Sequence, residues 1–201
     1  MVIERVQKMS VEEFLHFAES SEEWHEYIDG ELYPMTTPTL RHNIIGNNIA
    51  FSLRSLLAGK NCHALGMGQG VRVGATRFLI PDVCVVCDQP LLETDTRILL
   101  NPVLVGEVTS PTTVNIDRGA KRDFYFQAPS IEIYLVVDQD RLNVELHTRD
   151  GAGWRTVKYS KIDDELLLEA LNCSLSLRDI YRNVKFETRD SSDANEAEVS
   201  S

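Results

Sequence analysis

Ile80-Pro81-Asp82-Val83 ends an apolar run that is typical of a β-strand, and Val103-Leu104-Val105-Gly106-Glu107-Val108-Thr109 is a second strand of the same kind. A third segment, Asp117 to Tyr125, has the spacing of a helix. These segments place two carboxylates in otherwise apolar strands and one lysine, Lys121, on the helix that follows them. Carboxylates are rarely buried without a partner, so the stretch from Ile80 to Tyr125 is the first place to expect chemistry.

The composition is that of one folded domain. The chain has 201 residues, of which 43% are hydrophobic, and we assign residues 1–186 to the domain. Residues 187–201 are rich in Ser, Asp and Glu and predict an acidic disordered tail. No apolar run approaches the ~18 residues of a membrane span, and no signal-peptide core precedes the domain, so a cytoplasmic location is expected. The formal net charge of −11 argues against broad, nonspecific binding to duplex DNA.

The four cysteines do not have the density of a disulfide scaffold. Cys84-Val85-Val86-Cys87 has the spacing of a zinc or redox pair, but it lies inside an apolar strand and no second pair matches it. We therefore expect these cysteines to be structural, as small buried hydrophobic side chains.

The rest of the chain predicts a mixed sheet with helices packed against it. Trp24 to Met35 is typical of a hairpin with Asp29-Gly30 at its turn, and a long helix is expected from Pro38, capped by Thr37, to Gly59. Further strands are expected at 62–67, 71–73, 78–86, 103–109, 131–137, 142–147, 154–159 and 166–168, with helices at about 115–128 and 177–181 and a polar connection at 90–101.

The connections between these segments predict their pairing. The strands around Asp82 and Glu107 are joined without a helix, so we expect them to be antiparallel neighbours. The helix after Glu107 then leads to the strand at 131–137, which favours a crossover to a parallel partner.

Asp82 and Glu107 supply the hard oxygen ligands that Mg²⁺ or Mn²⁺ prefers. A metal ion between them would activate a water for attack on a phosphodiester. Thr109 shares a sheet face with Glu107 but carries no charge, so Lys121 is the best candidate for the cation beside that water. Two plainer interpretations stay open: Asp82 caps a turn, and Asp117 with Lys121 forms an ordinary helix ion pair.

Other charged side chains are weaker candidates. Glu26 shares a strand face with apolar residues, where a carboxylate needs a reason, although an edge-strand glutamate reaching solvent is an equal alternative. His42, in the first turn of the long helix, is expected to be a surface or capping residue rather than a ligand. The residues beside Lys121 that are candidates for contact with a nucleic-acid backbone are Arg118, Arg122 and Tyr125.

Five segments occur in a recognisable order. They are His25-Glu26-Tyr27-Ile28-Asp29-Gly30-Glu31-Leu32, Pro81-Asp82-Val83, Glu107-Val108-Thr109-Ser110-Pro111-Thr112-Thr113, Asp117-Arg118 with Lys121 and Tyr125, and Glu132-Ile133-Tyr134-Leu135-Val136-Val137-Asp138. Together they resemble the Uma-two family of predicted restriction endonucleases, within the PD-(D/E)XK nuclease superfamily. The resemblance covers roughly residues 8–185, and the loop Pro129-Ser130-Ile131 departs from the family pattern.

The resemblance implies a three-layer α/β restriction-endonuclease-like core, with a mixed central sheet flanked by helices and an N-terminal hairpin. It implies that Asp82 and Glu107 bind the metal, that Lys121 replaces the lysine missing at Thr109, and that Glu26 is an additional acid of the site. The superfamily often forms dimers, so the resemblance also makes a homodimer a possible state of this chain.

Two functions fit these observations. The first is a metal-dependent endonuclease that hydrolyses phosphodiester bonds in DNA. The alternative is a non-catalytic nuclease-fold module with a binding or regulatory role, which the acidic composition favours. The complete set of acids and lysine favours the enzyme.

Overall fold

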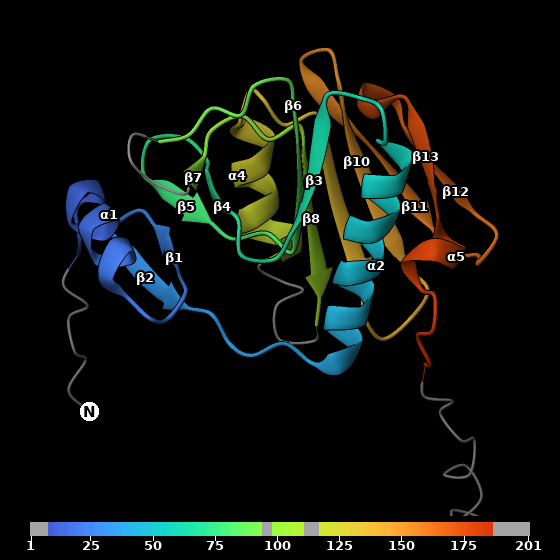
Figure 1. Cartoon of the computed structure of the whole chain (residues 1–201), viewed down its shortest axis with the longest axis horizontal. Coiled ribbons are helices and arrows are strands. Elements are labelled where there is room, and N and C mark those ends of the chain that lie inside the picture. Colours follow the sequence, from blue (N-terminus) through green and yellow to red (C-terminus); the bar gives the residue numbers. More distant parts are fainter. Residues whose placement is uncertain (1–7, 94–97, 111–116, 187–201) are drawn as a thin grey trace, which may run out of the picture.

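A mixed sheet of six strands forms the centre of the part of the chain that the structure describes (Figure 1). The structure is a computed structural model, and it describes residues 8–93, 98–110 and 117–186. The strand order is β11-β10-β9-β8-β6-β3, with only the β8–β9 pair parallel among the described strands of this sheet. Its strands are β3 (Cys62–Gly66), β6 (Val83–Cys87), β8 (Leu104–Thr109), β9 (Ile133–Asp138), β10 (Val144–Asp150) and β11 (Gly153–Tyr159).

Both pairings predicted for the strand that carries Glu107 are confirmed. β6 and β8 are antiparallel neighbours with Val83 opposite Gly106. β8 and β9 are parallel, with Glu107 beside Val136. All six residues of β8 and of β9 are buried, which is the pattern of strands covered on both faces.

Helices and a two-stranded sheet cover one face of the central sheet. The long helix α2 (Leu40–Leu56) packs there through Ile45, Ile49 and Leu53. Beside it lie the strand pair β12 (Glu165–Leu168) and β13 (Cys173–Ser176) and the short helix α5 (Leu177–Ile180). A strand near 166–168 and a last helical turn are confirmed, whereas β13 had no strand prediction.

The opposite face is covered by the helical segment that follows β8. The described part of this segment consists of a π-helical turn (Asp117–Lys121) and, directly after it, helix α4 (Arg122–Gln127). Tyr125 anchors it in an apolar cluster with Val105, Tyr134 and Val136. The central sheet therefore lies between helical layers, and the three-layer restriction-endonuclease-like core is confirmed.

A second mixed sheet extends the molecule at its N-terminal end (Figure 1). Its strand order is β2-β1-β5-β4-β7, and helix α1 (Val11–Ser20) packs on it through Phe14. The predicted hairpin is confirmed, with Asp29 and Gly30 at its turn and φ values of 51° and 103°. The strands are β1 (His25–Ile28), β2 (Glu31–Pro34), β4 (Gly70–Arg72), β5 (Arg77–Leu79) and β7 (Ile98–Leu99), the last of them within the predicted polar connection.

The strand predicted at 78–86 is two strands in different sheets. β5 belongs to the N-terminal sheet and β6 to the central sheet, and Ile80-Pro81-Asp82 joins them. Proline lacks an N–H for a strand ladder, so the chain leaves one sheet there and enters the other. The prediction that Asp82 ends a strand was wrong, because Asp82 directly precedes β6 at the junction of the sheets.

The start of the long helix also differs from the prediction. The structure begins α2 at Leu40, with the Thr39 side chain accepting a hydrogen bond from the His42 N–H. Thr37 and Pro38 lie before the helix, so the predicted cap was wrong. The prediction for the cysteines was wrong in part, because Cys62 and Cys87 are opposite each other in β3 and β6 and form a disulfide.

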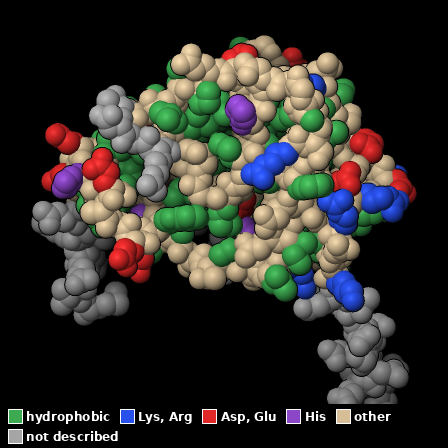
Figure 2. All heavy atoms as spheres, viewed as in Figure 1, with side chains coloured by type: hydrophobic (Ala, Val, Ile, Leu, Met, Phe, Trp, Pro, Cys, Tyr) green, Lys and Arg blue, Asp and Glu red, His purple; other side chains and the backbone are tan. Residues whose placement is uncertain are grey.

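Some predictions lie outside the described residues. They are the acidic tail 187–201, the break in the chain at 111–113 and the first residues of the helix predicted from about 115. Within the described residues, no helix is long and apolar enough to cross a membrane. Figure 2 shows charged side chains mainly at the two ends of one face, with mostly uncharged surface between them.

Candidate active site

The ammonium group of Lys121 lies between carboxylates from three different elements. Its Nζ is 2.9 Å from Glu26 Oε1 in β1 and 3.2 Å from Glu107 Oε1 in β8. Asp117 Oδ1, one helical turn earlier, is 3.9 Å away. All four side chains are buried, and Lys121 is only 9% exposed. The structure therefore brings together Glu26, Glu107 and Lys121, which are far apart in the sequence.

Local structure explains why the lysine points inward. Lys121 closes the π-helical turn, and Tyr125 follows it by one turn on the same helix face. π-helical turns are rare and often occur at functional sites. The turn sits over β8 and β9, where the Tyr134 hydroxyl donates to the Asp117 carbonyl oxygen at 3.0 Å. This bond holds the turn on the sheet at the level of Glu107.

Asp82 is held beside this cluster by two donors. Its Oδ2 accepts a hydrogen bond of 2.7 Å from the Val108 N–H, which directly follows Glu107. The same oxygen lies 3.2 Å from His42 Nε2 in α2. Asp82 thus ties the junction of the two sheets to β8, and the backbone N–H that it binds belongs to Val108 in β8 and not to its own turn.

The remaining contact of Glu107 comes from an aromatic residue. The Tyr125 hydroxyl donates to Glu107 Oε1 at 2.8 Å, the oxygen that also contacts Lys121. Glu26 uses a single oxygen in the same way, because its Oε1 accepts from the Ile80 N–H at 3.0 Å as well as contacting Lys121.

Burial and mutual repulsion set the protonation of the cluster. Burial raises the pKa of Glu107 well above its ordinary value; Lys121 opposes this shift, and Asp117, Asp82 and Glu26 add to it. Burial alone lowers the pKa of Lys121, but Glu107, Glu26 and Asp117 outweigh it and raise that pKa above its ordinary value. Lys121 is therefore held in its charged form.

The carboxylates are chemically suited to a divalent cation. Among the described residues, no three His, Cys, Asp or Glu side chains form a preassembled metal site. However, the hydrogen bonds and ion pairs described for Glu26, Asp82 and Glu107 all go to one oxygen of each. The second oxygen of each carboxylate has no partner in the described part of the chain. Hard oxygens of this kind are what Mg²⁺ and Mn²⁺ bind, so the donor set fits.

Other predicted residues take different positions. Thr109 is buried, and its hydroxyl lies 3.5 Å from the Val137 carbonyl oxygen. Tyr125 is fully buried and bonded to Glu107, so it does not present a surface to a nucleic acid. Arg118 contacts Glu145 at 3.2 Å, and Arg122 contacts its neighbour Asp123 at 2.8 Å, both with partly exposed side chains.

His42 belongs to the site, although its position in the sequence predicts a surface or capping residue. Its Nε2 faces Asp82, and its Nδ1 is buried without a hydrogen-bond partner among the described residues. Only the backbone of His42 takes part in capping, through the Thr39 hydroxyl. A histidine in a first helical turn carries no sequence signal for this contact, because Asp82 reaches it only through tertiary packing.

Comparison with known proteins gives three kinds of match. A model of the Uma2 family, described as "Putative restriction endonuclease", matches residues 11–179. The uncharacterized protein slr1290 of Synechocystis sp. (strain ATCC 27184 / PCC 6803 / Kazusa) is 32% identical over 181 residues, spanning 89% of this chain and 94% of that protein. The uncharacterized protein sll1609 of the same organism is 25% identical over 153 residues, spanning 75% and 86%.

The fold is also found in a solved structure. A crystal structure from Anabaena variabilis ATCC 29413, described as "a putative nuclease belonging to DUF820", superposes with a TM-score of 0.71 at 18% identity. The match covers 86% of this chain and 97% of that one. At this identity the likeness supports the fold.

Proposed function

The chain belongs to the Uma2 family, and from that premise we propose that it is a metal-dependent endonuclease that hydrolyses phosphodiester bonds in DNA. The observation that carries the proposal is the buried cluster of Glu26, Asp82, Glu107 and Lys121. Four ionisable groups are costly to bury together, and folds keep such clusters mainly at functional sites.

In this proposal Asp82 and Glu107 hold Mg²⁺ or Mn²⁺ through their second carboxylate oxygens. Such an ion, when bound, polarises a phosphoryl oxygen and lowers the pKa of its bound water. Val108 and His42 hold Asp82 in place through the other oxygen, and Tyr125 does the same for Glu107. Fixed ligands of this kind cost little reorganisation when the substrate arrives.

Lys121 and Glu26 have separate tasks. The Lys121 ammonium group stands next to Glu107 and offsets negative charge that develops on the phosphate. Glu26 orients Lys121 from the other side, and the Ile80 N–H fixes Glu26 in turn. Lys121 thereby takes the place of a lysine at the position of Thr109, where the buried hydroxyl carries no charge.

Incubation of the purified full chain with plasmid and linear DNA, across Mg²⁺ and Mn²⁺ concentrations, tests the proposal. We expect cleavage that requires the metal and that falls at least about 100-fold in Asp82→Asn, since removal of a metal ligand removes the ion's chemistry. Asp163→Asn is the matched control, because Asp163 is exposed and pairs only with Arg178 in the described structure. If no cleavage occurs with either metal, or if Asp82→Asn cleaves as well as the unchanged chain, the proposal is wrong.

One observation favours a non-catalytic module instead. Lys121 already supplies a positive charge to Glu26 and Glu107, so the cluster is partly neutralised by the protein itself. For a module of this kind, Mg²⁺ would leave the thermal stability unchanged and a macromolecular partner would raise it. A Mg²⁺-dependent rise in Tm that disappears in Glu107→Ala supports the enzyme. A homodimer and a cytoplasmic location stay predictions, the first of which light scattering on the purified chain checks.

A further inference from the structure

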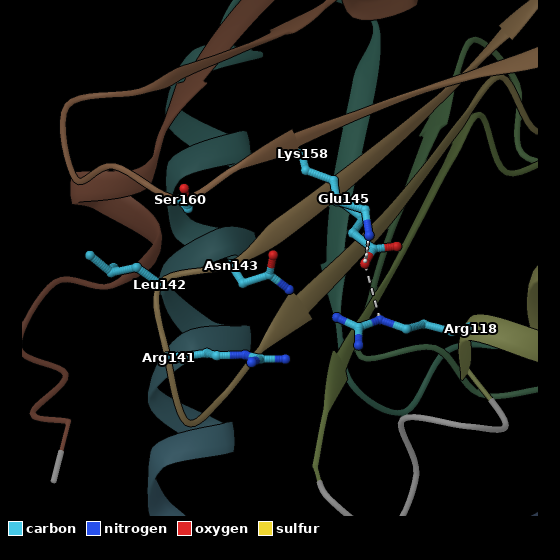
Figure 3. A pocket seen from close by; sticks show the side chains of 7 residues that line it. All are labelled: Arg118, Arg141, Leu142, Asn143, Glu145, Lys158 and Ser160. Atoms are coloured by element: carbon cyan, nitrogen blue, oxygen red, sulfur yellow. Dashed lines mark ion pairs between the residues drawn. The ribbon is translucent and has the colours of Figure 1, made fainter. Parts of the chain in front are cut away.

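A basic pocket lies on the same side of the central sheet as the candidate active site. It has a volume of about 320 Å³ and is formed by the π-helical turn, the β9–β10 connection and strands β10 and β11. Figure 3 shows Arg118 and Arg141 entering from opposite sides and pointing toward one another, with Glu145 and Lys158 above them. The uncharged polar side chains that line it are Asn143 and Ser160.

Strand register places this pocket next to the carboxylate cluster. Glu107 in β8 lies beside Val136 in β9, Val136 is opposite Glu145 in β10, and Glu145 is opposite Lys158 in β11. Residues in such a row project from one face of a sheet, and strands are spaced by about 4.8 Å. Glu107 and Glu145 are therefore about 10 Å apart along the row, so the pocket lies next to the carboxylate cluster. Arg118 also directly follows Asp117 of the cluster.

The charges in the pocket do not balance. Three basic side chains and a single carboxylate line it. Glu145 is buried and shared by two cations, since its Oε1 is 3.2 Å from both Arg118 Nε and Lys158 Nζ. Arg141 binds Asp138 through its Nε at 2.8 Å. The pocket therefore carries an excess of positive charge, although the net charge of the whole chain is −11.

Arg118 has hydrogen-bond donors that the protein does not satisfy. Its Nε and Nη2 are buried without a hydrogen-bond partner in the described part of the chain, although Nε lies close to Glu145. The guanidinium group presents its donors in a planar fork that matches the oxygens of a phosphate. His147, which also faces Glu145 at 3.8 Å, adds no positive charge at neutral pH because burial lowers its pKa to about 4.

We propose that this pocket, formed by Arg118, Arg141 and Lys158 around Glu145, binds a phosphate group of the nucleic-acid backbone beside the scissile phosphodiester. The choice of a nucleic acid as ligand rests on the proposed function, whereas the binding of a phosphate rests on the pocket itself. The pocket explains how an acidic protein holds a polyanion: a few cations gathered at one point replace a broadly basic surface.

Binding measured without divalent metal tests this inference independently of cleavage. A short fluorescein-labelled DNA duplex is titrated with the full chain by fluorescence anisotropy in EDTA, over a range of KCl concentrations. We expect Arg141→Gln and Lys158→Gln each to weaken binding about tenfold and to lower the salt slope by about one. Arg155→Gln is the matched control, because Arg155 lies on the same strand as Lys158 but pairs with Glu169 outside the pocket. This control is expected to bind like the unchanged chain.

Substitution of Arg118 needs a folding check, because it removes a cation from the buried Glu145. The paired variant Arg118→Gln, Glu145→Gln keeps the local charge balance, and we expect it to weaken binding as Arg141→Gln does while its circular dichroism stays unchanged.

The outcomes separate the two proposals. Cleavage with unaltered binding in the pocket variants overturns the phosphate site and leaves the nuclease intact. Binding that depends on the pocket, without cleavage in any metal, supports the site and removes the nuclease. Equal weakening by Arg155→Gln, or no binding by the unchanged chain, overturns the site.

Discussion

Replacing Lys121 by methionine should strongly destabilise the protein, because Lys121 is the buried cation among the carboxylates of the cluster. The substitution keeps the length of the side chain but removes the charge that lies 2.9 Å from Glu26 and 3.2 Å from Glu107. Unit charges about 3 Å apart interact by about 5 kcal/mol at an effective dielectric constant of about 20. Relief of the desolvation of Lys121 offsets part of that loss.

We expect Lys121→Met to lose about 3–5 kcal/mol of unfolding free energy, since breaking one partner of a buried pair leaves the other uncompensated. For a chain of this size the loss corresponds to a fall in Tm of roughly 6–20 °C. Urea unfolding near neutral pH, followed by circular dichroism, measures it. Lys161→Met is the matched control, because Lys161 is exposed, and it should change the stability by less than about 0.5 kcal/mol.

A double-mutant cycle makes the test specific. Lys121→Met combined with Glu107→Gln removes both charges, so the double variant should be more stable than the sum of the two single losses predicts, by at least about 1 kcal/mol. If Lys121→Met unfolds within about 1 kcal/mol of the unchanged chain, or if the cycle shows strict additivity, Lys121 does not neutralise Glu107 and the reasoning fails.

Three further predictions follow from single contacts. Tyr125→Phe removes the hydroxyl that donates to Glu107 at 2.8 Å and should cost about 1–3 kcal/mol in urea unfolding. Burial lowers the pKa of His147 to about 4, below the ordinary value of about 6.5, so the folded state binds its proton less readily than the unfolded chain. As the pH falls from ~6.5 toward ~4, His147 takes up a proton in the unfolded chain but not in the folded protein, so the free energy of unfolding decreases. His147→Asn should reduce this decrease by up to about 3 kcal/mol. Because Cys62 and Cys87 are joined, two of the four cysteines should react with a thiol reagent under denaturing, non-reducing conditions.

Each of these has a contrary result. A change below about 0.5 kcal/mol for Tyr125→Phe shows that the hydroxyl does not support Glu107. Parallel curves of stability against pH for His147→Asn and the unchanged chain show that His147 titrates normally. Four reactive thiols under non-reducing conditions show that Cys62 and Cys87 are separate.

Local patterns were enough to predict most of the framework. Asp29-Gly30 indicates a hairpin because both residues take positive φ there, and the structure has this turn. Glu107 stands out because it interrupts an apolar strand that is covered on both faces. These signals depend only on neighbouring residues, so they are visible in the sequence.

Errors occurred where two local interpretations were equally good. Thr37 and Thr39 both precede an apolar helical pattern, and only the docking of the helix shows that Thr39 caps it. Ile80-Pro81-Asp82 is compatible with a strand end or with a passage between sheets, and no local pattern states which sheet the next strand joins.

By itself, the sequence determined most of the strands and helices, the positions of Asp82 and Glu107 in apolar segments, and the presence of Lys121 on the helix that follows them. Periodicity and polarity encode these features directly, residue by residue. Tertiary structure alone decided that Glu26 reaches Lys121, that His42 faces Asp82, and that cations from separate elements enclose a pocket around Glu145. These contacts join segments that are distant in the chain, and they depend on strand register and helix docking, which are settled only when the whole core packs at once.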